Sequence, residues 1–185
     1  MGHPAFFDEA PRILVRDPLA ALLGAADGGL FEYRYLDAVR LAGHSCPTVA
    51  GAWLTARLAL RALYPDEPAE RGGIAVQMPA PVDEGVNGVI SQVFTLVTGA
   101  AAGNGFHGIG GRYARQGLLS FADAPGGGAI RFSRRDTGAA VAVELDLSRV
   151  PPVPQLRELM ASALQPAATD AQRAAFARAW QDRVR

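Results

Sequence analysis

The alternation of apolar and polar positions divides the chain into helical and strand-like segments. Residues 48–63 have the apolar content and length of a partly buried helix, and Pro47 stands where a helix start favours proline. Apolar positions also recur at helical spacing in residues 30–41 and 85–98. We therefore expect three long helices in the first hundred residues, with a break at Gly43 between the first two.

Strand signals lie in the middle and the second half of the chain. Residues 74–78 form a short apolar run that Pro79 ends, and residues 118–121 form another. Residues 129–133 and 139–147 alternate apolar and polar side chains about a polar turn, which is typical of a β-hairpin. The pattern predicts an α+β protein with a mainly antiparallel sheet and packed helices.

Three regions follow from this pattern. Residues 1–30 contain several prolines and a short helix capped by Asp17, and we expect them to form an N-terminal arm. Residues 31–150 are expected to form the α+β core. Residues 151–185 begin with a proline-rich stretch and are expected to form a helix-rich C-terminal extension, which packs on the core or on a second subunit.

Composition limits the classes of protein to consider. The 185 residues are 49% hydrophobic and 19% charged, which suits one globular domain with a core. Eighteen basic residues balance eighteen acidic ones, so no net charge draws the protein to nucleic acid or to an anionic membrane. All the basic residues are arginine, and the absence of lysine excludes Schiff-base catalysis, lysine-linked pyridoxal phosphate and the P-loop phosphate clamp.

The single cysteine and the apolar stretches bear on location. One cysteine cannot form a disulfide within the chain, and the N-terminal segment carries acidic residues where a signal peptide needs basic ones. The longest apolar stretches are interrupted by polar residues and glycine, and they are too short or too polar for a bilayer span. We expect a cytoplasmic protein without a transmembrane helix.

The most informative stretch is Gly43-His44-Ser45-Cys46-Pro47, which places an imidazole and the only thiol two residues apart before a predicted helix. Cys46 is expected at the N-cap, where unpaired backbone N–H groups and the positive end of the helix dipole favour a thiolate. Thiolate and imidazole are ordinary ligands of zinc. His44 and Cys46 are therefore candidate metal ligands.

The same stretch carries a family resemblance. Residues 36–52 resemble the opening motif of the FmdE-like family, named after a formylmethanofuran dehydrogenase component, in which a His-Gly-His-x-Cys-Pro-Gly element leads into a helix. Residues 82–93 and 98–105 are similar to that family's acidic turn with its following helix and to its glycine-rich stretch. The resemblance implies an α+β fold, a homodimer and a metal such as zinc near the His and Cys. It does not imply formylmethanofuran chemistry, because fold transfers better than function.

The chain departs from the family pattern at ligand-like positions. Ala42 stands where the family has its first histidine, Thr48 replaces a glycine, and Gly85 and Ala100 stand where many members carry cysteines. The C-terminal zinc ribbon of many members needs four cysteines and cannot form in a chain with one. A metal site here is therefore rebuilt from other residues, or it is absent.

Other residues are candidates to complete the site. His107 lies in a glycine-rich loop, and Asp83 and Glu84 are candidate carboxylate ligands or supports for the ligands. A zinc ion held by His44, Cys46 and His107, with one position open, allows Lewis-acid or hydroxide chemistry. The alternatives are simple hydrogen-bonded histidines, a buried cysteine that acts as a small hydrophobe, and a charge pair at a helix N-terminus.

The glycine-rich loop suggests a second kind of site. Residues 103–108 match the glycine pattern of dinucleotide-binding proteins, but they follow a predicted helix rather than a strand, so a flexible loop that presents His107 is the better interpretation. Asn104, Arg112 and Arg115 in or near this loop are candidates for binding a carboxylate or phosphate.

Three functions are compatible with the sequence. The first is a small metal-binding protein that holds zinc or another transition metal through its His-x-Cys-Pro motif, with an unknown reaction and an unknown small molecule as partner. The second is a protein that binds haem or another large cofactor, with Cys46 as thiolate ligand. The third is a non-catalytic accessory protein or structural dimer without a functional metal.

Overall fold

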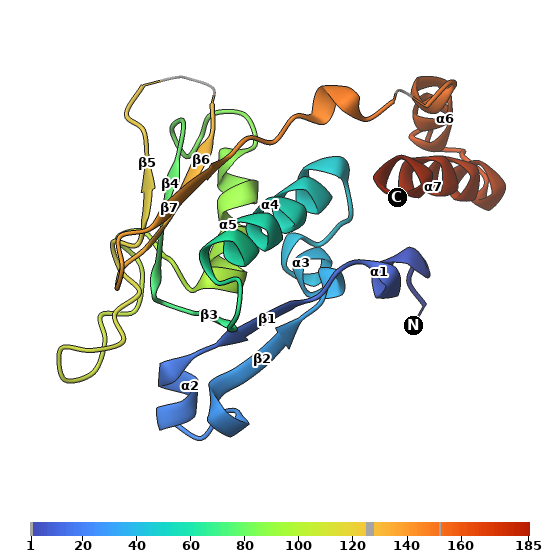
Figure 1. Ribbon diagram of the computed structural model, residues 1–185. Coiled ribbons are helices and arrows are strands. Elements are labelled where there is room, and N and C mark those ends of the chain that lie inside the picture. The colour runs from blue at the N-terminus through green and yellow to red at the C-terminus, as the bar shows by residue number, and fades with distance from the viewer. Residues whose placement is uncertain (1, 125–127, 152) are drawn as a thin grey trace.

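Two mixed sheets and a central pair of helices make up the body of the protein. The structure is a computed structural model that describes residues 2–124, 128–151 and 153–185. Helices α4 (Pro47–Leu63) and α5 (Asn87–Thr98) lie against a four-stranded sheet, with a three-stranded sheet below them (Figure 1). The expected α+β fold is confirmed.

The smaller sheet is built around the N-terminal segment. β1 pairs antiparallel with β2 and parallel with β3, and the side chains of Ile13 and Val15 on β1 are buried. The region expected as an arm therefore supplies the central strand of a sheet, together with helices α1 and α2. The bounds are α1 Phe6–Glu9, β1 Ile13–Arg16, α2 Pro18–Leu22, η1 Asp27–Gly29, β2 Leu30–Tyr33 and β3 Ala69–Glu70. Asp17 caps α2, as predicted.

The larger sheet has the strand order β5-β4-β6-β7. β4 pairs parallel with β5 and antiparallel with β6, and β6 and β7 form the predicted antiparallel hairpin. Each sheet contains one parallel pair of strands, so both sheets are mixed. Among the described residues, three of the five strand pairs are antiparallel. The bounds are β4 Ile74–Met78, β5 Leu119–Phe121, β6 Ile130–Arg134 and β7 Ala140–Val143.

The prediction of a helix over residues 30–41 was wrong for the first third of that range. Leu30–Tyr33 forms β2, and the helix α3 begins only at Tyr35 and ends at Ala42. Two of the four residues in β2 are aromatic, which suits a half-buried strand, and pairing with β1 satisfies the backbone. Arg34 then separates the two elements, because its backbone N–H donates to the Asp37 carboxylate at 2.8 Å and starts the helix.

The core lies between α4, α5 and the inner face of the larger sheet. Trp53 on α4, Phe94 on α5 and Phe132 on β6 are all almost completely buried. The rings of Phe94 and Phe132 meet edge to face, with centroids 5.1 Å apart. α4 and α5 are thereby fixed on the sheet, and their ends position the loops described below.

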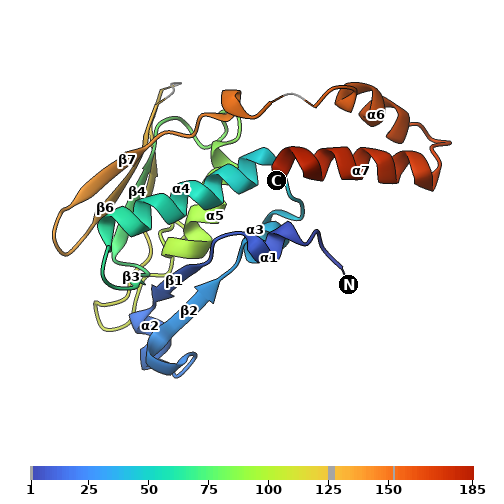
Figure 2. The same ribbon diagram turned by 45° about the vertical axis from the view of Figure 1, so that its right-hand side comes forward.

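The C-terminal region is helical, as expected. α6 (Leu156–Ala163) and α7 (Asp170–Val184) follow the short helix η2 (Leu147–Arg149) and a proline stretch, in which Pro152 lies outside the described residues. Figure 2 shows the α6–α7 hairpin extending from the body, with the C-terminal end of α7 beside the start of α4. Trp180 and Val184 pack against the core.

Candidate functional site

The turn between α3 and α4 places His44, Ser45 and Cys46 at the start of the central helix. Gly43 ends α3 in the left-handed conformation, with φ 75°, which favours glycine because it lacks a Cβ. Pro47 then occupies the first helical position of α4. The sequence therefore folds this segment into a tight helix–helix turn.

Cys46 is the N-cap residue of α4, as predicted. Its Sγ accepts a hydrogen bond from the backbone N–H of Val49 at 3.4 Å, and its own carbonyl accepts from the N–H of Ala50. The side chain is 9% exposed. The sulfur thus satisfies one of the unpaired N–H groups of the helix start, and Cys46 is buried.

His44 is exposed, and a backbone hydrogen bond sets the orientation of its ring. Its Nδ1 lies 2.9 Å from the carbonyl oxygen of Ala42. Because a carbonyl only accepts, Nδ1 carries the hydrogen, and in the neutral ring Nε2 is left as the acceptor. Histidines that bind metals commonly have this arrangement, with one nitrogen on a backbone carbonyl and the other on the ion.

Ser45, between the two candidate ligands, is buried and held from two sides. Its hydroxyl lies 2.9 Å from the hydroxyl of Tyr35 on α3, and its carbonyl accepts from the indole N–H of Trp180 on α7 at 2.7 Å. Burial raises the pKa of Tyr35, although the hydrogen bond with Ser45 opposes the shift, so this phenol stays protonated. Sequence reasoning missed Tyr35 and Trp180 as supports of the turn.

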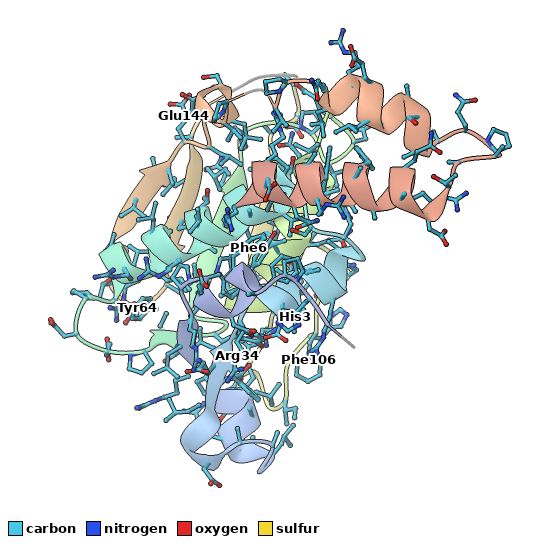
Figure 3. All side chains as sticks on the ribbon, turned by 90° about the vertical axis from the view of Figure 1, so that its right-hand side faces the viewer. His3, Phe6, Arg34, Tyr64, Phe106 and Glu144 are labelled. Atoms are coloured by element: carbon cyan, nitrogen blue, oxygen red, sulfur yellow. The ribbon has the colours of Figure 1, made fainter. Side chains whose placement is uncertain are left out.

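His107 lies in a different part of the chain fold. The loop between α5 and β5 lies at the lower left of Figure 1, whereas the α3–α4 turn lies at the right. The side chain of His107 is exposed, and so is that of Phe106, which Figure 3 labels and which is 43% exposed. Within a single chain, His107 is therefore exposed to solvent on a loop that is separate from the α3–α4 turn.

Backbone hydrogen bonds close this loop upon itself. The N–H of Arg115 donates to the carbonyl of Phe106 at 2.7 Å, and Ile109 and Arg112 exchange two backbone hydrogen bonds. Gly108 has φ 98°, and a Cβ there would meet the carbonyl oxygen of Arg112. The loop that was expected to be flexible thus has an ordered hydrogen-bonded structure.

The two candidate carboxylates lie in the turn before α5. Asp83 is exposed, whereas Glu84 is half-buried and its backbone N–H donates to the carbonyl of Pro81. Within the part of the chain that the structure describes, Oε2 of Glu84 is buried without a hydrogen-bond partner. Glu84 is therefore the less solvated member of this pair.

A three-ligand cluster does not form within one chain. Among residues 2–124, 128–151 and 153–185, no group of three or more His, Cys, Asp and Glu side chains could hold a metal ion. His44 and Cys46 are neighbours in one turn, and His107, Asp83 and Glu84 do not complete a set with them in this structure.

A groove of about 550 Å³ lies beside the end of α3. Its lining includes Leu41, Arg71, Gln92, Asn104, Leu119 and Phe121. Leu41 is three peptide units before His44, so their Cα atoms lie within about 11 Å of each other. Asn104, a predicted anion-binding candidate, lies in this groove, and Arg71 is a lining residue that sequence reasoning missed.

Arg115 serves a buried ion-pair network instead of standing free beside His107. It is 7% exposed, and its Nη2 donates to Oδ1 of Asp17 at 2.6 Å, while Nη1 of Arg71 donates to Oδ2 at 2.9 Å. Burial alone would raise the pKa of Asp17, but the hydrogen bond from Arg71 and the charge of Arg115 outweigh it and lower the pKa. The network joins the N-terminal segment to the loops beside α5. Arg112, in contrast, is exposed.

Fold and site together define an α+β protein with a His-x-Cys turn at the N-terminus of its central helix. No protein-family model, curated protein or solved structure matches the chain. None of the helices in the described residues combines the length and apolarity needed to cross a bilayer.

Proposed function

We propose that this is a small metal-binding protein that holds a transition metal, zinc foremost, through His44 and Cys46. The observation that carries the proposal is the donor set of the turn. The Nδ1–Ala42 hydrogen bond leaves Nε2 of His44 as a metal-binding nitrogen, and a cysteine sulfur follows two residues later. When bound, zinc supplies Lewis-acid chemistry.

The chain's own residues prepare the turn for this role. Tyr35 and Trp180 hold Ser45, Gly43 allows the sharp exit from α3, and the start of α4 fixes the backbone of Cys46. Few side-chain rotations then remain to be ordered when an ion binds. The groove next to Leu41 is the place we propose for an organic small molecule beside the ion.

The remaining ligands are proposed to come from a second copy of the chain. The family resemblance implies a homodimer, and His107 is displayed on a loop with two exposed apolar side chains, Phe106 and Ile109, which are 43% and 47% exposed. Exposed large apolar side chains on an ordered loop are suited to a protein interface. A homodimer in which His107 of one copy joins His44 and Cys46 of the other would make a three-ligand site. We also propose a cytoplasmic location, where the free thiol stays reduced.

The position of Cys46 favours an ion over haem. Cys46 is 9% exposed and does not line the groove beside α3. Because a compact ion needs less space at a sulfur than a macrocycle does, the ion is favoured here. A dimer without metal is the other alternative, and it would leave the two ligand residues with only their packing and capping roles.

The test is the metal content and absorption spectrum of the purified protein without a histidine tag. The proposal predicts zinc or another transition metal in stoichiometric amount, lost in both His44→Ala and Cys46→Ser, with no haem absorption. A Soret band would support haem instead. A colourless protein without metal after exposure to zinc would leave the third function, a structural dimer.

A further inference from the structure

The last helix meets the proposed metal turn through one hydrogen bond. The indole Nε1–H of Trp180 on α7 donates to the carbonyl of Ser45 at 2.7 Å, across 135 positions of sequence. Ser45 lies between His44 and Cys46. Figure 2 shows the C-terminal end of α7 beside the start of α4.

This contact acts on the backbone that joins the two proposed ligands. The Ser45 carbonyl and the Cys46 N–H belong to one rigid peptide plane, so fixing the carbonyl fixes the direction in which the chain enters Cys46. Cys46 keeps the extended backbone of an N-cap, with φ −151° and ψ 166°. On the other side, the hydroxyl of Tyr35 holds the side chain of Ser45 at 2.9 Å.

Few apolar side chains of the hairpin pack against the core. Of the described residues of α6 and α7, Trp180 and Val184 are the apolar ones that pack against the core, and Phe176 supports Trp180 with ring centroids 5.8 Å apart. Figures 1 and 2 show α6 and the first half of α7 extending from the body. An element held by few contacts opens more readily than the core does.

We infer that the C-terminal hairpin regulates metal binding: docking of α7 through Trp180 holds His44 and Cys46 in their binding arrangement, and a bound metal strengthens that docking in return. The inference rests on the proposed function. Because coupling between two binding events is reciprocal, the same factor describes the effect of docking on metal affinity and of metal on docking. Trp180 is a positioning residue in this account.

The first test replaces Trp180 with phenylalanine, which keeps an aromatic ring and removes the N–H donor. Zinc affinity is measured by competition with a chromophoric chelator. Outer groups that orient metal ligands typically change affinity by 10-fold or more, and we expect about 10-fold weaker binding in Trp180→Phe. The control is Ile130→Val on β6, away from the turn, which should lower the unfolding temperature and leave zinc affinity unchanged.

The second test measures the same coupling from the side of the hairpin. Hydrogen exchange of the α7 amides is compared in the wild-type protein with and without zinc, and we expect zinc to slow it. The slowing should disappear in Trp180→Phe.

The outcomes separate this inference from the function on which it rests. A wild-type protein that binds no zinc removes the proposed function. A wild-type protein that binds zinc without any change in α7 exchange, or a folded Trp180→Phe with wild-type affinity, overturns the inference and leaves the proposed metal site standing.

Discussion

Cys46 has two roles at one atom, because its sulfur caps α4 and is a proposed metal ligand. Serine is a strong N-cap residue and alanine is a poor one, so two substitutions separate these roles. We expect both Cys46→Ser and Cys46→Ala to lose the metal, whereas only Cys46→Ala loses about 1 kcal/mol of metal-free stability to the missing cap. Urea unfolding of metal-free protein and metal analysis measure the two effects. Metal retained in Cys46→Ser would remove the sulfur from the ligand set.

Asp17 is a buried carboxylate shared by two arginines, of which Arg115 is buried and Arg71 is partly buried. Its carboxylate pairs with Arg115 and Arg71, and removing one partner of a buried ion pair leaves an uncompensated charge. Asp17→Ala should therefore destabilise the protein by about 3–5 kcal/mol in denaturant unfolding. The exposed pair of Arg12 and Glu32 is the control, and Glu32→Ala should cost less than about 1 kcal/mol.

The same network makes stability depend on pH. The folded-state pKa of Asp17 is lowered, so its contribution is present above the ordinary carboxyl pKa and is lost as the pH falls through the lowered value. The wild-type protein should therefore lose more free energy of unfolding between pH 7 and acidic pH than Asp17→Asn does. Asp136, whose pKa is about 2 beside Arg134, titrates in both proteins and cancels from the comparison. Equal losses in the two proteins would contradict the network's role.

At the residue scale, the sequence predicts what is local. The N-cap role of Cys46 and the cap of α2 by Asp17 follow from neighbouring residues, and the structure confirms both. The bonds of Tyr35 and Trp180 to Ser45 depend on how α3 and α7 pack, which short-range patterns do not encode. Arg115 shows the same limit, since its partner Asp17 lies 98 positions away.

At the scale of elements, the loop that carries His107 depends on glycine at position 108. Gly108 has φ 98°, and a Cβ there would meet the backbone of Arg112, whereas a Cβ at Gly110 would meet no atom within 4 Å. Gly108→Ala should cost about 3 kcal/mol and speed the exchange of the Ile109 and Arg112 amides. Gly110→Ala, with φ 56°, should cost about 1 kcal/mol. Similar effects of both variants would argue against the close-packed loop.

Helices and strands were predicted correctly where the periodic apolar pattern extended over many residues. They were missed where the strands were short. α4, α5 and the β6–β7 hairpin were predicted within a few residues. β1 and β3 were not predicted, since a strand of four residues or fewer has little periodicity and its stability comes from partners elsewhere in the chain. Pairing with β1 also explains why the start of the predicted helix at residues 30–41 is a strand.

At the scale of the whole molecule, the two-copy site predicts complementation between damaged chains. A His107→Ala chain and a Cys46→Ser chain each lack one ligand of every site in their own homodimers, and a mixed dimer contains one intact site. After the chains of an equal mixture have exchanged partners, about a quarter of the wild-type sites should bind zinc, because half of the dimers are mixed. Metal analysis after size-exclusion chromatography measures this recovery. A monomeric protein, or His107→Ala with wild-type zinc affinity, would exclude His107 of a second copy as a ligand.

The central claim is that the His44–Cys46 turn binds a metal, and X-ray absorption at the zinc edge tests it most directly. The account predicts one sulfur neighbour at about 2.3 Å and imidazole nitrogens at about 2.0–2.1 Å in the wild-type protein. The sulfur signal should vanish in Cys46→Ser. Bound zinc with only nitrogen and oxygen neighbours, and the same spectrum in Cys46→Ser, would contradict the account.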